Sequence, residues 1–334
     1  MQMKKRVFVT GHLGYIGAQL VDVLKAAGHY VTGCDINLFE ECLCAPFTSP
    51  DHQLIRDICT LAPRDLEGYD CVMHLAAISN DPMGELDAQI TQKINYHGTV
   101  ALAQAAKQAG VPLFLFASSC SIYGRADQLD IRETDATAPL TNYAASKIES
   151  EQALISLSDE RFQVGLLRNA TAYGFSPRLR IDLVVNNLLA SALAYGEMRV
   201  MSDGTPWRPL IHCRDIARAF LAWMDFPPKN IALALNIGSN SENYQVRDIV
   251  QKIQPHLPLA KVVFTGEIGA DPRNYRVNFD LLQEKIPQFQ CSYTLEQGIV
   301  ELLKQFHHLG FSSQDFESGR FVRLQVLKRN LGIN

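Results

Sequence analysis

Three glycines at a fixed spacing constrain the fold of this chain more than any other feature. Gly11, Gly14 and Gly17 form the pattern G-x-x-G-x-x-G, directly after the apolar run of residues 6–10 and at the start of a helical pattern that ends at Gly28. Glycines allow a tight turn and a close approach of the backbone to a phosphate, and the start of a helix offers free N–H groups. The pattern predicts a dinucleotide site, with an ordinary glycine-rich turn as the alternative.

The rest of the first half predicts the sheet that this turn belongs to. Short apolar runs alternate with helical patterns, and the runs are continuous rather than alternating in polarity, which is typical of a parallel sheet covered on both faces. We therefore expect an α/β fold with a Rossmann-type, doubly wound parallel sheet. The expected strands are residues 6–10, 30–35, 71–77, 113–119 and 162–168, and the expected helices are residues 15–28, 87–108 and 142–157.

The second half is less regular, and we interpret it as a smaller, interleaved C-terminal substrate-binding lobe. After Arg168 the alternation weakens, although strand and helix signals return later. We expect residues 1–170 to form an NAD-binding Rossmann domain, to which part of 209–250 returns, and residues 171–334 to form mainly the substrate-binding lobe. The basic and apolar tail at 320–330 is interpreted as a docked C-terminal helix.

Composition bounds the partners and the compartment. The formal net charge of -4 gives no electrostatic argument for nucleic acid or an anionic membrane. No stretch reaches the roughly 18 apolar residues of a membrane span, and the start lacks a signal-peptide pattern, so a cytoplasmic protein is expected. The eight cysteines are scattered, as free thiols are. Cys42 and Cys44 form a lone C-x-C without a second pair, so no metal is expected.

An aspartate at the end of the second strand favours NAD as the cofactor. Asp35 lies 18 residues after Gly17, where a carboxylate can bind the adenosine ribose hydroxyls and repel a 2′-phosphate. No Arg or Lys follows it directly. A turn-forming aspartate is the alternative. Three further groups are cofactor candidates from their positions: Tyr15 and Ile16 between the glycines, Asp57 and Ile58 after the run HQLIR, and Leu75, Ala76 and Ala77 at the end of the 71–77 strand.

A tyrosine and a lysine four residues apart predict acid–base chemistry. Tyr143 and Lys147 share one face of the expected helix at 142–157. A nearby ammonium stabilises a phenolate and lowers the pKa of the tyrosine, which can then exchange a proton with a substrate hydroxyl. Ser119 ends the 113–119 strand and can orient the substrate oxygen. The alternatives are a solvated helix face for the pair and a turn cap for the serine.

These segments together resemble the extended short-chain dehydrogenase/reductases, particularly the nucleotide-sugar epimerases and dehydratases. The matching pieces are VTGHLGYIG, Asp35, HLAA, SSCSIYG, YAASK, LRNATAYG, VVNNLL and WRPLIHCRDIARA, which run from residue 7 to about 220. The resemblance implies an NAD(P)-binding Rossmann domain with Ser119, Tyr143 and Lys147 as catalytic residues. It also implies a lobe that holds a sugar nucleotide, and a homodimer.

The resemblance also suggests substrate contacts in the second lobe. Arg208 matches an arginine that binds the nucleotide diphosphate, which suits a guanidinium. Asn187 matches an asparagine near that diphosphate, and Arg273 and Arg276 lie where a second phosphate contact is common. Thr171 stands where many members have asparagine, a departure that bears on the usual diphosphate contact. A surface arginine and a helix cap are the alternatives for Arg208 and Asn187.

The residues beside the expected catalytic serine bear on the reaction. Sugar 4,6-dehydratases of this group carry an Asp-Glu pair there, whereas this chain has Cys120 and Ser121, so elimination of water is not expected. The segment that begins at Ser79 also departs from the common pattern and is expected to shape the sugar pocket. The match ends near residue 285, which leaves room for a carrier other than a sugar nucleotide.

Three functions follow from these patterns. The first is an NAD-dependent epimerase of a nucleotide-linked sugar, which oxidises the sugar to a keto intermediate and reduces it again. The second is an NAD(P)-dependent sugar dehydrogenase or 4-ketoreductase that uses the same residues. The third is a non-catalytic module that senses NAD(H) or binds a partner. Such a module would not need the set of Ser119, Tyr143 and Lys147.

Overall fold

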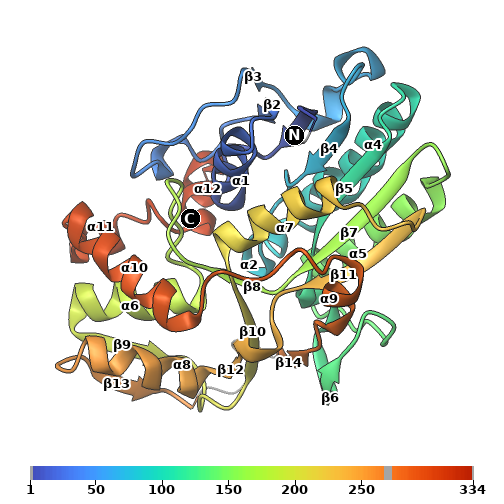
Figure 1. Cartoon of the computed structure of the whole chain (residues 1–334). Helices are drawn as coiled ribbons and strands as arrows, with labels where there is room; N and C mark the ends of the chain where they lie inside the picture. The colour runs from blue at the N-terminus through green and yellow to red at the C-terminus, as the bar shows by residue number, and fades with distance from the viewer. Residues whose placement is uncertain (1–2, 267–272, 333–334) are drawn as a thin grey trace.

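Seven parallel strands form the central sheet of the protein (Figure 1). The computed structural model describes residues 3–266 and 273–332. Within these residues the order of the central strands is β11-β7-β5-β4-β1-β2-β3, and every neighbouring pair is parallel. In chain order they are β1 (Arg6–Thr10), β2 (Tyr30–Asp35), β3 (His52–Ile55), β4 (Cys71–His74), β5 (Leu113–Ser119), β7 (Gln163–Asn169) and β11 (Ala232–Ile237).

Helices cover both faces of this sheet, which confirms the predicted doubly wound α/β fold. On one face α1 and α7 pack against each other, and on the other α4 packs against α5. The side chains of β1 alternate between these layers, as strand geometry requires: Val9 packs with Phe220 of α7, and Phe8 packs with Leu102 of α4. The bounds are α1 (Tyr15–Ala26), α4 (Thr99–Gln108), α5 (Asn142–Leu157) and α7 (Cys213–Asp225).

Several predicted elements agree closely with the structure, and two differ. The helix predicted at 142–157 is α5, with the same bounds. The strand predicted at 71–77 is shorter in the structure and ends at His74. The N–H of Leu75 still donates to the carbonyl of Thr10 at the edge of the sheet, and the chain then leaves β4. The helix predicted at 87–108 is divided into α3 (Ala88–Thr91), a π-helical turn at Gln92–Gly98 and α4.

A second set of elements forms a smaller core below the sheet in Figure 1. Two small sheets, in the orders β12-β10-β8 and β13-β9, belong to this core, whereas a third, β14-β6, packs on the core of the central sheet, in which Ile131, Tyr275 and Val277 are buried. Leu189, Met198, Ile249 and Phe306 are among the buried side chains that hold the helices and strands of the smaller core together. The strands of the three small sheets are β6 (Arg125–Ile131), β8 (Thr171–Tyr173), β9 (Glu197–Val200), β10 (Trp207–His212), β12 (Asn243–Gln245), β13 (Lys261–Phe264) and β14 (Asn274–Val277). The helices of this core are α6 (Val184–Tyr195), α8 (Val246–Ile253), α10 (Leu295–Leu309) and α11 (Ser313–Glu317), whereas α9 (Asp280–Lys285) packs against β11 of the central sheet.

Two short helices complete the chain. The first is α2 (Asp81–Gly84), which follows β4 and packs against α5. The second is α12 (Arg323–Leu331), which lies within the tail predicted to be helical and packs against α2. Among the described residues, no helix has the combination of length and apolar composition that a membrane crossing needs.

A buried ion pair fixes α5 against the sheet. Glu151 of α5 and Arg168 of β7 approach to 2.7 Å, with side chains only 4% and 10% exposed. The same carboxylate accepts a hydrogen bond from Ser118 at the end of β5, and Arg168 donates to the hydroxyl of Tyr123. Because both charges are satisfied by several partners, the pair sets the position of α5 relative to two strands of the sheet.

We expect Arg168→Met to lower the free energy of unfolding by about 3–5 kcal/mol, because it leaves the Glu151 carboxylate buried without its cation. Urea unfolding monitored by circular dichroism measures this. The matched control is Lys25→Met, which breaks the more exposed pair of Lys25 with Asp51 at 2.5 Å and should cost less than about 1 kcal/mol. Equal losses in both variants would contradict the importance given to the buried pair.

Candidate functional site

One cavity lies at the edge of the sheet where the parallel strands end. In a parallel sheet the carboxyl ends of all strands meet at the same edge, and ligands of such folds bind in the crevice there. The cavity is lined by residues that directly follow β1, β2, β3, β4, β5 and β7. The sequence-predicted residues on its walls are Gly11, Gly14, Tyr15, Ile16, Gly17, Asp35, Asp57, Ile58, Leu75, Ala76, Ala77, Ser79, Ser119, Tyr143, Lys147, Thr171 and Arg273.

The glycine turn forms a cradle that has no space for side chains. A Cβ on Gly17 would lie 2.0 Å from the carbonyl oxygen of Gly11, and one on Gly11 would lie 2.6 Å from the backbone nitrogen of Ala76. Gly11 also has a φ of +75°, which other residues rarely adopt. Helix α1 begins just after Gly14, and no side chain caps it. Its first N–H groups therefore face the cavity, an arrangement that suits a phosphate.

Asp35 lies at the end of β2 with both carboxylate oxygens already in use by the backbone. One oxygen accepts from the N–H of Leu13 at 3.1 Å and the other from that of Asn37 at 2.8 Å. Each oxygen keeps further lone pairs that can accept a ribose hydroxyl. Asp57 has a local role too, since it caps the turn after β3 through the N–H of Cys59. The cradle and these carboxylates fit the phosphates and ribose of a dinucleotide.

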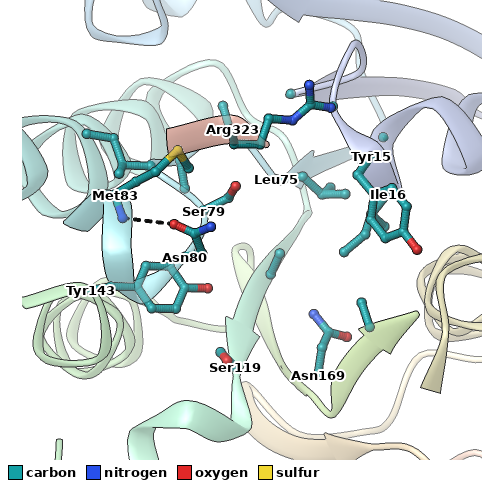
Figure 2. A pocket seen from close by; sticks show the side chains of 18 of the residues that line it. Tyr15, Ile16, Leu75, Ser79, Asn80, Met83, Ser119, Tyr143, Asn169 and Arg323 are labelled. Carbon is teal, nitrogen blue, oxygen red and sulfur yellow. Dashed lines mark hydrogen bonds between the residues drawn. The ribbon is translucent and has the colours of Figure 1, made fainter. Parts of the chain in front are cut away.

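The three residues expected to be catalytic meet at the end of β5. Figure 2 shows the Tyr143 hydroxyl directed into the cavity above Ser119. Lys147 lies one helical turn after Tyr143, with its Nζ 5.6 Å from the centre of the tyrosine ring. Its ammonium donates to the carbonyl of Ala117 at 2.8 Å and lies 4.5 Å from the centre of the Phe116 ring. The lysine is 3% exposed, so its position is fixed.

Burial shifts the pKa values of this pair in opposite directions. Burial raises the pKa of Tyr143 and the nearby Asp81 carboxylate raises it further, while a hydrogen bond with Ser119 lowers it. Burial lowers the pKa of Lys147 to about 7, although the Glu151 carboxylate acts in the opposite sense. Perturbed titratable groups that face a cavity together are typical of acid–base sites.

The segment after β4 forms the wall opposite the cradle. Asn80 caps α2 by accepting a hydrogen bond from the N–H of Met83 at 2.9 Å, as Figure 2 shows. Its amide also donates to Asp182, which forms an ion pair with the buried Arg180. Ser79, Asn80, Asp81 and Met83 thus line the cavity, and the role of this segment in shaping a sugar pocket stays a prediction. Sequence reasoning did not single out Arg180.

Two other predicted residues reach the cavity from the second lobe. Arg273 forms an ion pair of 2.6 Å with Asp81, the first residue of α2. Thr171, at the start of β8, lines the cavity beside Asn169 and is half-buried. Arg273 therefore lies on the side of the cavity that holds α2, the helix that packs against α5 with Tyr143.

Three of the predicted phosphate contacts do not line this cavity. Arg208 is 6% exposed and donates to the backbone carbonyls of Trp207 and Arg273. Asn187 donates its amide to the carbonyl of Ile181 at 2.9 Å. Arg276 is exposed, with its guanidinium 5.7 Å from the centre of the Trp207 ring system. These contacts hold the second lobe together, and a role of the three residues in substrate binding remains a prediction.

The structure identifies a positioning residue that sequence reasoning missed. Asn95, in the π-helical turn, is 1% exposed and binds both backbone groups of Ile78, accepting from the N–H and donating to the carbonyl. It also donates to Ser146 of α5. This asparagine therefore fixes the loop after β4 against the helix that carries Tyr143. In the sequence, Asn95 is a single amide side chain within a helical pattern, which does not by itself indicate a positioning role.

Comparison with known proteins agrees with this architecture. The model of the "NAD dependent epimerase/dehydratase family" matches residues 7–238. A protein of Bacillus subtilis strain 168 described as an "uncharacterized UDP-glucose epimerase" is 27% identical, over 80% of this chain and 88% of its own. A UDP-N-acetyl-alpha-D-glucosaminuronate decarboxylase of Bacillus cytotoxicus is 26% identical, over 92% of this chain and 99% of its own.

A solved structure extends the likeness to the whole fold. The protein MoeE5, in complex with UDP-glucuronic acid and NAD, aligns with a TM-score of 0.79 and 26% identity, over 91% of this chain and 99% of its own. The resemblance inferred from the glycine turn and from the segments around Ser119 and Tyr143 is thereby confirmed. The protein is an NAD-dependent enzyme of the extended short-chain dehydrogenase/reductase type and belongs to the NAD-dependent epimerase/dehydratase family.

Proposed function

We propose that this enzyme is an epimerase of a nucleotide-linked sugar, acting by transient oxidation and re-reduction. The observation that carries the proposal is the shared cavity, in which Ser119, Tyr143 and Lys147 face the space above the glycine cradle. One cavity that holds both a dinucleotide and a sugar allows both halves of such a reaction without release of the substrate.

The residues have distinct tasks in this proposal. Bound NAD supplies the acceptor for a hydride and returns it on reduction. Tyr143 takes the proton from the sugar hydroxyl and gives it back, Ser119 holds the reacting oxygen, and the ammonium of Lys147 stabilises the phenolate. Because Lys147 is fixed by the carbonyl of Ala117, its charge stays close to the tyrosine during both steps. The half-buried Asp81 carboxylate near Tyr143 raises the pKa of the tyrosine and so favours return of the proton.

The residues after Ser119 argue against elimination of water. Cys120 is 1% exposed and donates to the carbonyl of Arg168, and burial raises its pKa. Ser121 is also buried, and both its N–H and its hydroxyl donate to Ser119. Neither side chain offers the acid and base that dehydration needs at this position. Ser121 instead orients the Ser119 hydroxyl.

The substrate class is proposed from the second lobe and from relatives. The names of the relatives cited above refer to UDP-glucose and to UDP-linked uronic acids. A nucleotide sugar would reach from Tyr143 toward Thr171 and Arg273, which also line the cavity. A homodimer and a cytoplasmic location stay predictions from the sequence.

The proposed reaction is tested by incubating the enzyme with a panel of UDP-, dTDP-, GDP- and CDP-linked hexoses and hexuronic acids. We expect proton NMR to show one sugar converted to an isomer inverted at a single carbon, without net change of absorbance at 340 nm. Tyr143→Phe should lower the rate by about 10²–10⁴-fold.

Other products would overturn the proposal in favour of a named alternative. Reduced cofactor formed in step with product indicates a dehydrogenase, and consumption of added reduced cofactor indicates a ketoreductase. Loss of water indicates a dehydratase, and release of carbon dioxide indicates a decarboxylase. Tyr143→Phe with full activity would exclude the proposed acid–base role.

We expect Lys147→Met to move the rising limb of the pH–rate profile to higher pH. In the proposed mechanism the ammonium favours the phenolate form of Tyr143, so its removal should raise the pKa of the tyrosine and reduce the fraction of phenolate at neutral pH. Measurement of kcat/KM between pH 6 and 10 checks this, with thermal unfolding as a test of folding. Lys25→Met, on the surface of α1, is the control and should leave the profile unchanged. A uniform loss of rate at every pH would contradict this role.

A further inference from the structure

Three buried arginines lie close together beside the cavity with one direct carboxylate partner, and two of them, Arg180 and Arg323, line it. Arg178, Arg180 and Arg323 are 3%, 6% and 2% exposed. Asp182 pairs with Arg180. Arg178 instead donates to the backbone carbonyls of Phe39 and Glu40, and the carboxylates of Asp35 and Glu40 act on it only from a greater distance. Buried cations are paired in folded proteins, so the excess positive charge predicts an anion in this cavity.

Of the three arginines, Arg323 most clearly lacks a hydrogen-bond partner among the described residues. Its Nη2 donates to the carbonyl of Arg178 at 3.1 Å, whereas its buried Nη1 has no hydrogen-bond partner among residues 3–266 and 273–332. The guanidinium lies 4.7 Å from the centre of the Phe39 ring, in the segment that follows β2. In Figure 2 this side chain enters the cavity from the side opposite Ser119 and Asn169.

The tail that carries Arg323 is fixed to two segments that border the cavity. On one side Arg320 donates to the carbonyls of Glu41 and Leu43, and Arg329 forms an ion pair of 2.7 Å with Glu41. On the other side the carbonyl of Phe321 accepts from the N–H of Ile181 at 3.0 Å. Helix α12 also packs against α2 and places Leu327 in the cavity wall. It thus reaches from the segment after β2 to the helix beside Tyr143.

We propose that α12 closes the dinucleotide cavity and that Arg323 binds the diphosphate of NAD. The uncapped start of α1 and Arg323 line the same cavity, so a diphosphate would meet backbone N–H groups from the cradle and a guanidinium from the tail. This inference rests on the NAD site and not on the reaction proposed above. The helix lies outside residues 7–238, which match the family model.

A consequence is that the cofactor and the tail hold each other in place. With α12 docked, the dinucleotide is covered by Leu327 and Arg323, so its release requires the tail to move. The bound diphosphate in turn supplies the missing partner of Arg323 and favours the docked tail. Slow exchange of the cofactor suits an enzyme that uses the same NAD in every turnover.

Calorimetric titration of the full chain, freed of nucleotide, tests the contact. We expect Arg323→Met to weaken binding of NAD and of ADP-ribose by about ten- to a hundredfold, the range for a hydrogen bond to a charged group, and to leave adenosine within about twofold. Arg323→Lys, which keeps the charge, should fall between the wild type and Arg323→Met. The matched control is Lys328→Met on the same helix, which should bind as the wild type does, because the Lys328 side chain does not line the cavity and makes no hydrogen bond or ion pair among the described residues.

Two results would overturn the contact. The first is an affinity of Arg323→Met for ADP-ribose within twofold of that of the wild type. The second is an equal loss of affinity for adenosine, which would place the arginine away from the phosphates. Hydrogen exchange of the wild-type chain tests closure without a variant. Amides of α12 should exchange about tenfold or more slowly with NAD bound, and an unchanged rate would exclude closure. An enzyme that shows this pattern but inverts no sugar would refute the proposed function alone.

Discussion

The contact between Gly17 and the carbonyl of Gly11 is the constraint on which the site depends. It brings the first helix against the end of the first strand at a distance that no side chain permits. This close approach directs the uncapped N–H groups of α1 to the edge of the sheet. Because all seven central strands are parallel, the residues that follow the carboxyl end of each strand meet at that same edge. The glycine turn therefore decides where the other strands must present their polar groups.

Buried charge then holds the opposite wall at a fixed distance from this turn. The pair of Glu151 with Arg168 fixes α5 to β5 and β7. Lys147, on the same face of α5 as Glu151, donates a hydrogen bond to the carbonyl of Ala117 in β5. A helix attached at two such points cannot rotate, so Tyr143 stays directed into the cavity. Burying these ions is costly, and for Glu151 and Arg168 the cost is offset by several hydrogen bonds to each. The same burial lowers the pKa of Lys147.

The sequence predicted the parts of the site that are local along the chain. The glycine spacing, the aspartate that ends β2 and the tyrosine–lysine pair on α5 each depend on neighbours within a few residues, and the cavity contains all of them. Contacts between distant segments left no such pattern. The pairing of Asp81 with Arg273 joins residues 192 positions apart, and Arg323 meets Arg178 across 145. A helical pattern in the tail predicted α12, but not which cavity it covers.

The local motifs do not by themselves specify which reaction the enzyme performs. The local motifs lie in residues 7–238, which the family shares, and relatives of this chain carry the names of an epimerase and a decarboxylase. Motifs common to several reactions cannot select one of them. The selecting contacts must then involve the distant segments, such as the wall from Ser79 to Met83 and Arg273 that faces it from the second lobe. In the proposed reaction, their charge and shape would decide how a sugar can turn between oxidation and reduction.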